Sequence, residues 1–341
     1  MREEKITVGA GTEFALDAIL TLPDEAHTGA KAEAEAGAEA KTAAGATEEA
    51  AAQAATIVTK AGGDTAGIPA VVLVHGSGPQ DKDETIGALT PFKDIAHALA
   101  DKGIATLRYD KRTKIYGRKM MEHPGEVTVE TETIDDAILA TKLLRADPRI
   151  GKVFILGHSL GAMLAPRIDA EGGNFDGLII AAGSLRTLRE IMLDQITELV
   201  KNYKGLVKKL ADKQTAKLKA DFAAIDALTD AQAKEKKVFG KTRAYYFKEM
   251  EEHPAGPYLE LSCKPAFIFQ GDKDFQGYPD KDFAGYAQLL SDRPNVTLKL
   301  FPDLNHVFTH SYATKTAKDY KVPGTVDAQV TDAIAAWIRA R

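Results

Sequence analysis

The residues whose types and spacing best suit catalysis lie in the segment VFILGHSLGA, at positions 153–162. Ser159 stands there between Gly157 and Gly161, in the pattern G-x-S-x-G, at the end of an apolar run. A tight turn from a buried strand into a helix strains the serine backbone, and the flanking glycines remove side chains that would clash there. The pattern therefore predicts a nucleophilic serine at the carboxyl end of a sheet, facing the positive end of the following helix.

A serine hydroxyl is a weak nucleophile until a base accepts its proton, and a carboxylate must orient that base. Two later segments supply these groups in the chain order expected after a serine on such a turn. Asp274 ends the segment FIFQGDKD, and His306 follows LKLFPDLN. We therefore predict a catalytic triad of Ser159, Asp274 and His306. Asp272 is the alternative acid, and His310 is the alternative base.

Acyl transfer builds negative charge on a carbonyl oxygen, and each positioned N–H donor there stabilises it by about 3 to 4 kcal/mol in comparable enzymes. We expect the backbone amide of Leu160, directly after the nucleophile, to be one donor. The second is expected in the loop HGSGP, whose small residues let the backbone approach a ligand. We assign it to the amide of Ser77, with Gly78 as the second choice.

These residues require a framework of buried strands, and the sequence predicts one from about position 68 onward. Short apolar runs alternate there with helical stretches, and the runs are PAVVLVHG, IATLRYD, KVFILGHS, GLIIAAGS, PAFIFQGDKD and VTLKLFPDLNH. Continuous runs are typical of strands buried on both faces, and their alternation with helices indicates parallel crossovers. The predicted fold class is therefore α/β, with a mostly parallel, doubly wound sheet.

Two segments interrupt this pattern. Residues 24–67 are rich in Ala, Glu, Gly and Lys and contain no aromatic residue, which predicts a disordered loop insertion. Residues 184–261 lack strand-like runs and carry apolar residues at helical spacing, which predicts a helical cap inserted between core strands. The core is then expected to comprise residues 1–183 and 262–341.

The cap is expected to contribute to a substrate pocket. Aromatic residues often line apolar ligand sites, so Tyr245, Tyr246, Phe247 and Tyr258 are the candidates from the cap. His158, next to the predicted nucleophile, is a further candidate for the pocket. The other apolar residues of the cap are expected to pack against the core.

Five segments occur in the order found in the bacterial EstD-like carboxylesterases of the α/β-hydrolase superfamily. They are HGSGPQDKDET, PFKDIAHALADKGIATLRYDKRT, GHSLGAMLAPRI, QGDKDF and LNH. This resemblance runs from about residue 68 to 341 and implies the α/β-hydrolase fold, the same serine triad, no cofactor or metal, and a preference for short acyl chains. Within it, QDKDET and RYDKRT suggest no chemical step, and we expect their charged residues to fix loops.

The predicted function is a serine carboxylesterase that hydrolyses small carboxylic esters through an acyl-enzyme. A hydroxycinnamoyl (feruloyl-type) esterase and a small-peptide or amide hydrolase remain alternatives. A peptidase would need an acid to hold the amino terminus of the peptide, and the cap offers Glu249, Glu251 and Glu252, although a solvated helix face explains them equally well. A non-catalytic binding protein would show a broken triad, and none is seen.

Composition excludes several other classes. The net charge of −5 argues against a nucleic-acid or anionic-membrane surface. No apolar run approaches the roughly 20 residues that span a bilayer, and no signal-peptide core is seen, so a cytoplasmic location is expected. Cys263 has no partner for an internal disulfide, and we expect a buried structural thiol. The oligomeric state stays open, with a homodimer as one option.

Overall fold

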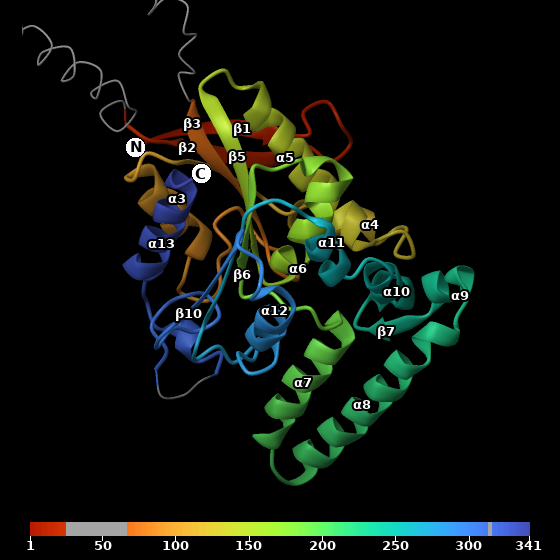
Figure 1. Ribbon diagram of the computed structural model, residues 1–341. Helices are drawn as coiled ribbons and strands as arrows, with labels where there is room; N and C mark the ends of the chain where they lie inside the picture. The colour runs from red at the N-terminus through yellow and green to blue at the C-terminus, as the bar shows by residue number, and fades with distance from the viewer. Residues whose placement is uncertain (25–66, 313–315) are drawn as a thin grey trace, which may run out of the picture.

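One eight-stranded sheet runs through the described part of the molecule, in the order β1-β2-β4-β3-β5-β6-β9-β10 (Figure 1). The computed structural model describes residues 1–24, 67–312 and 316–341. The strands are β1 (Arg2–Val8), β2 (Leu16–Leu22), β3 (Ile68–Val74), β4 (Ala105–Tyr109), β5 (Ile150–His158), β6 (Gly177–Ala181), β9 (Ala266–Gly271) and β10 (Val296–Phe301). Apart from its two end positions, the insertion predicted at 24–67 lies outside the described residues.

Strand directions confirm the predicted, mostly parallel sheet. β1 pairs antiparallel with β2, and β2 with β4, whereas the other neighbours in this sheet are parallel. β5 lies centrally, with Gly157 opposite Val74 of β3 and Ile180 of β6. The loops that follow β3, β5, β6, β9 and β10 therefore meet at one edge of the sheet, where ligands bind in open α/β sheets.

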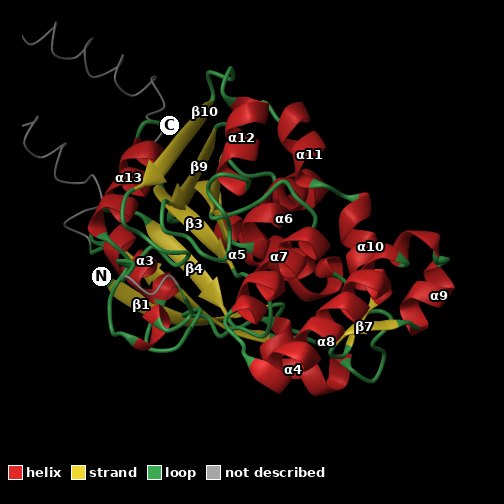
Figure 2. Ribbon diagram, turned by 90° about the horizontal axis from the view of Figure 1, so that it is seen from below, coloured by secondary structure: helices red, strands yellow, loops and turns green. Residues whose placement is uncertain are grey.

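Helices cover both faces of the sheet, as predicted for a doubly wound fold (Figure 2). One face carries α3 (Pro91–Ala100) and α13 (Ala328–Arg339), and the other carries α5 (Asp135–Ala146), α6 (Leu160–Ile168) and α12 (Asp282–Leu290). On β3, Val71 and Leu73 pack with the first group, whereas Val72 and Val74 pack with the second. Because successive strand residues point to opposite faces, a continuous apolar run is needed to cover both.

A second, mostly helical part lies between β6 and β9, where the sequence predicts a cap (Figure 1). Its elements are α7 (Leu188–Lys201), α8 (Gly205–Ala223), α9 (Asp230–Glu235), β7 (Lys237–Phe239), β8 (Thr242–Arg243), α10 (Ala244–Glu252) and α11 (Ala255–Leu261). The short hairpin of β7 and β8 is not predicted by the helical spacing. In the core, α4 (Arg112–Met120) follows β4, and single helical turns occupy Glu130–Ile134, Asp169–Gly173 and Asp319–Lys321; a further one, Ile225–Ala227, lies in the cap.

Two expectations about apolar and thiol burial are wrong. Several apolar residues of the cap are exposed, namely Leu199, Tyr203, Leu206, Val207 and Leu210. They lie where α7 and α8 extend away from the sheet, so helical spacing there does not indicate packing on the core (Figure 1). Cys263 is also exposed, because it lies in the loop before β9 and the buried strand begins only at Ala266.

Among residues 1–24, 67–312 and 316–341, no helix combines the length and the apolar character needed to cross a membrane.

Candidate active site

The turn between β5 and α6 holds Ser159 in a strained conformation, with φ of 54° and ψ of −115°. The backbone N–H of Ser159 donates to the carbonyl oxygen of Ala181 on β6 (2.9 Å). A side chain at Gly157 would clash with the backbone of Gly161, and a side chain at Gly161 would clash with the backbone of Val74. Close backbone approach therefore requires both glycines, and strain of this kind is concentrated at functional sites.

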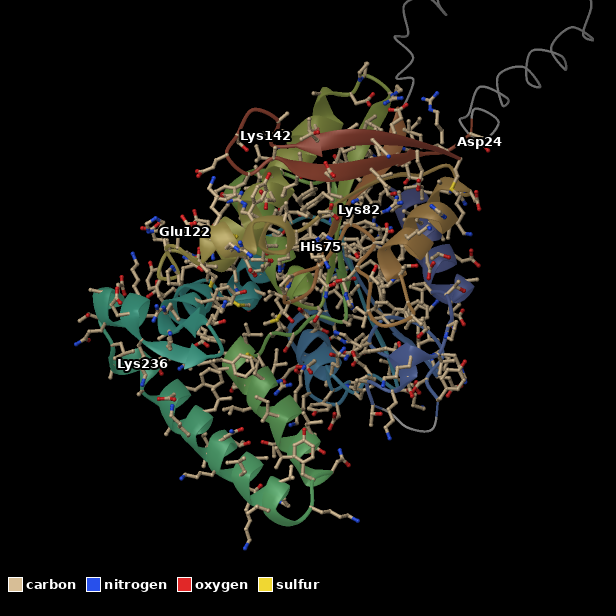
Figure 3. The ribbon with its side chains drawn as sticks, turned by 180° about the vertical axis from the view of Figure 1, so that it is seen from behind. Asp24, His75, Lys82, Glu122, Lys142 and Lys236 are labelled. Atoms are coloured by element: carbon tan, nitrogen blue, oxygen red, sulfur yellow. The ribbon has the colours of Figure 1, made fainter. Side chains whose placement is uncertain are left out.

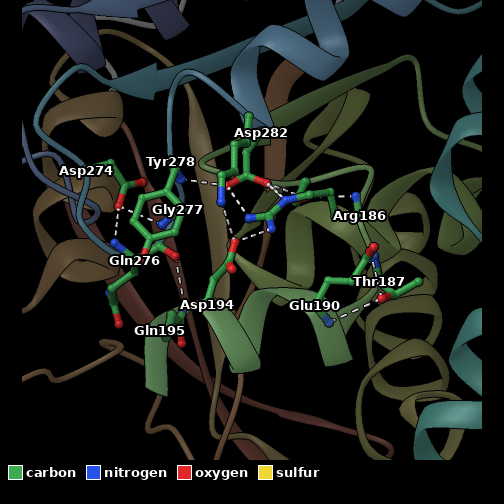
Figure 4. Close-up of polar contacts among 12 residues, drawn as sticks. Arg186, Thr187, Glu190, Asp194, Gln195, Asp274, Gln276, Gly277, Tyr278 and Asp282 are labelled. Carbon is green, nitrogen blue, oxygen red and sulfur yellow. Dashed lines mark hydrogen bonds and ion pairs between the residues drawn. The ribbon is translucent and has the colours of Figure 1, made fainter. Parts of the chain in front are cut away.

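Asp274 and His306 come from the loops after β9 and β10 and are both buried. Nδ1 of His306 lies 2.8 Å from Oδ2 of Asp274. The other carboxylate oxygen accepts hydrogen bonds from the backbone N–H groups of Gln276 (2.8 Å) and Gly277 (2.9 Å), as Figure 4 shows. Because a carboxylate only accepts, Nδ1 carries the proton and Nε2 of the neutral ring is left to accept one.

The alternative acid and base have other partners. Asp272 accepts a hydrogen bond from the side chain of Lys273 (2.6 Å) and another from a backbone N–H group. His310 is exposed, and its ring packs edge-on against Tyr312. In the described contacts neither residue reaches His306, which is paired with the first-choice acid.

Ser159 and His306 line one cavity of about 600 Å³, which is bounded by residues of both the core and the cap. The predicted oxyanion-hole residues Leu160, Ser77 and Gly78 line the same cavity. Leu160 is also the first residue of α6, where helix N–H groups have no partner within the helix. Across the described ranges no hydrogen bond joins the Ser159 hydroxyl to His306, and such bonds often tighten only when substrate is bound.

A second imidazole–carboxylate pair lies behind this site, and the sequence gives no prediction for it. His158 and Glu84 are buried, and Nδ1 of His158 lies 3.0 Å from a carboxylate oxygen of Glu84. Nε2 of His158 lies 3.0 Å from the backbone oxygen of His306. His158 does not line the cavity, contrary to the prediction, because it ends β5 and its side chain has these buried partners instead.

The two buried histidines beside glycine turns differ in charge. Burial lowers the pKa of His75 to about 4, and its Nε2 lies 3.0 Å from the backbone oxygen of Asp81. Burial also acts to lower the pKa of His158, but the adjacent Glu84 carboxylate outweighs it and raises that pKa. Figure 3 shows His75 inside the molecule; for comparison, Lys236 of the cap, labelled in the same view, is at the surface. A carboxylate in contact with the ring thus reverses the effect of burial on the pKa of His158.

Of the three cap tyrosines predicted to line the pocket, only Tyr246 does so. Tyr245 instead packs beneath the ammonium group of Lys234, which lies 4.6 Å from the ring centroid. The hydroxyl of Tyr258 lies 2.9 Å from Nδ1 of His253. Successive residues of α10 differ by about 100° around the helix axis, so Tyr245 and Tyr246 face different directions.

Most of the apolar lining on the cap side comes from residues that the sequence assigns to packing. They are Leu188, Ile191, Met192 and Ile196 of α7 and Phe239 of β7, whereas Phe247 of α10 lines the cavity as predicted. Those of α7 follow helical spacing, which indicates an apolar face. Spacing alone does not say whether such a face meets the sheet or a cavity.

Two carboxylates line the cavity, and each is already paired. Glu132 accepts a hydrogen bond from the hydroxyl of Tyr246 (2.7 Å) and lies 3.2 Å from Nζ of Lys111. Asp282 forms an ion pair with Arg186 (2.8 Å), as Figure 4 shows. Among the described residues, no group of three or more His, Cys, Asp or Glu side chains is arranged to hold a metal ion.

The cap acids do not line the cavity. Glu249 is buried and lies 2.7 Å from Arg167 of α6, which joins the cap to the core. Glu251 pairs with Arg189 within the cap, and Glu252 is exposed. None of the three is therefore placed to receive the amino terminus of a substrate in this cavity.

Residues 68–310 match the family model described as serine aminopeptidase, S33. The chain belongs to this family. Esterase EstD of Thermotoga maritima is 39% identical over 274 residues, which confirms the resemblance predicted from the sequence. The aligned stretch is 79% of this chain but only 62% of that relative.

Solved structures confirm the α/β-hydrolase fold. Est1E from Butyrivibrio proteoclasticus superposes with a TM-score of 0.54 at 13% identity, over 98% of each chain. That protein has also been solved with ferulic acid bound. Proline iminopeptidase of Mycobacterium smegmatis gives a TM-score of 0.51 at 13% identity, over 99% of each chain. At this identity the likeness concerns the fold alone.

Proposed function

We propose that the chain is a serine carboxylesterase that hydrolyses small carboxylic esters through an acyl-enzyme. The main support is the 2.8 Å contact between Asp274 and His306, in the same cavity as the strained Ser159. A carboxylate that holds Nδ1–H leaves Nε2 to act as a base toward a serine hydroxyl. The 39% identity to a protein named as an esterase supports the same assignment.

The first half-reaction forms the acyl-enzyme. Nε2 of His306 accepts the hydroxyl proton while Oγ of Ser159 attacks the ester carbonyl, and His306 then gives that proton to the departing alcohol. The amides of Leu160 and Ser77, with Gly78 as the alternative to Ser77, stabilise the oxyanion. In the second half, water attacks the acyl group with His306 as base, and the carboxylic acid leaves.

The charges in the cavity favour an ester over a peptide with a free amino terminus. An ammonium group needs an acid that is not already neutralised, but Glu132 and Asp282 each have a cationic partner. Lys241 and Arg243 of the cap add positive charge to the same cavity. We therefore assign the chain to ester hydrolysis within a family whose description is aminopeptidase.

A hydroxycinnamoyl ester is the second candidate substrate. A cavity of about 600 Å³ has room for more than a short acyl group, since pockets of roughly 300 to 1,000 Å³ enclose whole drug-sized ligands. Tyr246 and Phe247 give it an aromatic side. Est1E, which has been solved with ferulic acid, has the same fold.

The test is to measure kcat/KM on p-nitrophenyl esters from acetate to palmitate, with methyl ferulate and an aminoacyl anilide in the same panel. We expect turnover that is highest for short acyl chains and absent in Ser159→Ala. Dominant turnover of methyl ferulate would move the substrate to the second candidate. Dominant turnover of the anilide, or equal turnover by Ser159→Ala, would contradict the proposal.

A further inference from the structure

The sequence segments QDKDET and RYDKRT, to which no chemical step is assigned, meet at one residue of the oxyanion loop, Gly76. Glu84 of the first segment accepts a hydrogen bond from the N–H group of Gly76 (2.8 Å). Lys111 of the second donates from Nζ to the carbonyl oxygen of Gly76 (3.0 Å). All three contacting groups are buried, and Gly76 directly precedes Ser77, the proposed oxyanion donor.

The same carboxylate reaches the general base through His158. Both ring nitrogens of His158 face groups that only accept hydrogen bonds, namely the Glu84 carboxylate and the carbonyl oxygen of His306, each at 3.0 Å. Both contacts are hydrogen bonds only if both ring nitrogens carry protons. His158 is therefore an imidazolium, and its charge is balanced by Glu84.

We propose that Glu84, His158 and Lys111 form a positioning clamp that holds the oxyanion loop and the general-base loop against the nucleophile turn. The clamp touches no reacting atom. It holds Gly76 at its N–H group and at its C=O group, and that C=O belongs to the same peptide unit as the N–H of Ser77. It also holds the backbone of His306, and His158 directly precedes Ser159 in the chain. This inference rests on the proposed function for its catalytic consequence.

The backbone of Glu84 supports a specific role for this residue. Its φ of 52° lies in the left-handed region, which L-residues with a side chain seldom adopt. That conformation directs a fully buried carboxylate toward Gly76 and His158. The buried His158 also lowers the pKa of Glu84 against the effect of burial, so the carboxylate stays charged.

Charged groups around His158 come from several loops. The Glu84 carboxylate raises the pKa of His158 most strongly among them, and Asp274 adds to the effect from the loop after β9. The ring of His306 lies 4.9 Å from the ring of His158. His75 lies on the other side of Glu84 and is held neutral by burial. Loss of one proton from His158 would therefore break one of its two hydrogen bonds.

The first experiment compares Glu84→Leu with Glu84→Gln. Leucine removes the acceptor for Gly76 and the partner of His158, whereas glutamine can accept from Gly76 and donate to a neutral His158. For Glu84→Leu we expect kcat on a short-chain ester to fall roughly 10- to 100-fold with KM within about twofold, since small displacements of positioning groups have effects of this size. Glu84→Gln should restore most of this loss.

A matched control is His97→Asn, which breaks an imidazole–carboxylate pair of 2.8 Å with Glu3, far from the cavity. It should leave kcat unchanged. The pH profile gives a second readout: kcat/KM of wild type should decline as pH rises through the raised pKa of His158, and Glu84→Gln should lack this decline because its hydrogen bonds need only a neutral ring. Lys111 is present in wild type and in Glu84→Gln, so it does not cause the expected difference between their pH profiles.

Amide hydrogen exchange of peptides covering residues 75–78 and 306–309 tests the clamp without any activity. Faster exchange in both peptides of Glu84→Leu, with exchange near that of wild type in Glu84→Gln, supports the clamp even if no ester is turned over. Unchanged exchange, or kcat of Glu84→Leu within threefold of wild type, overturns it. A kcat loss matched by a loss of folded protein in both variants also overturns it. Absence of esterase activity in wild type would overturn only the proposed function.

Discussion

The core side and the cap side of the cavity use their polar groups differently. On the core side, Asp274, His306, Glu84 and His158 are buried and each makes at least one hydrogen bond within the protein. On the cap side the lining is mainly apolar, and Nε of Arg243 is buried without a hydrogen-bond partner in the described residues. The proposed catalytic groups are thus held by buried hydrogen bonds, whereas the cap side, which we propose contacts the substrate, is mainly apolar.

The largest expected effect tests the core side. In Asp274→Asn, the amide cannot hold His306 in the tautomer that leaves Nε2 as a base, so kcat should fall by about 10⁴-fold. KM should change little, because the carboxylate does not contact the substrate. The measurement is steady-state kinetics on a p-nitrophenyl ester.

Asp272→Asn is the matched control for this prediction. Asp272 lies two residues away and pairs with Lys273 rather than with His306. It should keep kcat within about threefold of wild type. Equal losses in the two variants would mean that the loop after β9, and not the Asp274 carboxylate, carries the effect.

The second-largest expected effect concerns the contact between the cap and the core. Glu249 of the cap and Arg167 of the core form a buried ion pair of 2.7 Å. Arg167 keeps its ion pair with Glu171 (2.8 Å), so Glu249→Gln should lower the free energy of unfolding by about 1.5 to 3 kcal/mol, the range for a hydrogen bond to a charged group. Glu251→Gln, in a more exposed pair within the cap, should cost about 1 kcal/mol or less. Urea unfolding measures the free energy of unfolding of both variants. Similar losses would mean that the buried pair between cap and core stabilises the protein no more than a pair within the cap.

The sequence predicted the core side of the molecule better than the cap side. Continuous apolar runs identify buried parallel strands, and the candidates Ser159, Asp274 and His306 stand directly after such runs, so their shared edge follows from topology. The predictions that Tyr245 and Tyr258 line the pocket were wrong, because the sequences of α10 and α11 do not show which face of each helix points to the cavity. Glu84 was missed because its role depends on a backbone conformation and on contacts from two distant loops.

A smaller expected effect tests the lowered pKa of a buried histidine on the core side. The pKa of His75 is about 4 in the folded protein and about 6.5 when unfolded, because burial disfavours its charged form. Stability from this residue is thus present above pH 6.5 and is lost as pH falls toward 4, since the unfolded chain then binds a proton that the folded state does not. The loss should be on the order of 1 to 2 kcal/mol at pH 5.

Thermal unfolding of His75→Gln between pH 7 and pH 4.5 checks this prediction. Glutamine can still donate to the backbone oxygen of Asp81 but has no proton to gain, so the fall of Tm with acid should be shallower than in wild type. His123→Gln changes an exposed histidine and should leave the slope as in wild type. A wild-type slope in His75→Gln would place the acid sensitivity in other groups.

The smallest effect tests whether the cap side selects substrate by apolar contact alone. Ile191 of α7 lines the cavity, and Ile191→Val removes one methylene, worth about 0.8 kcal/mol of burial. For esters long enough to reach it, kcat/KM should fall about fourfold through KM, while kcat and acetate hydrolysis stay unchanged, since uniform binding is lost. Leu206→Val at the exposed end of α8 should have no effect on any ester. An equal loss for acetate would mean that α7 positions the chemistry as well, which would remove the distinction between the two sides.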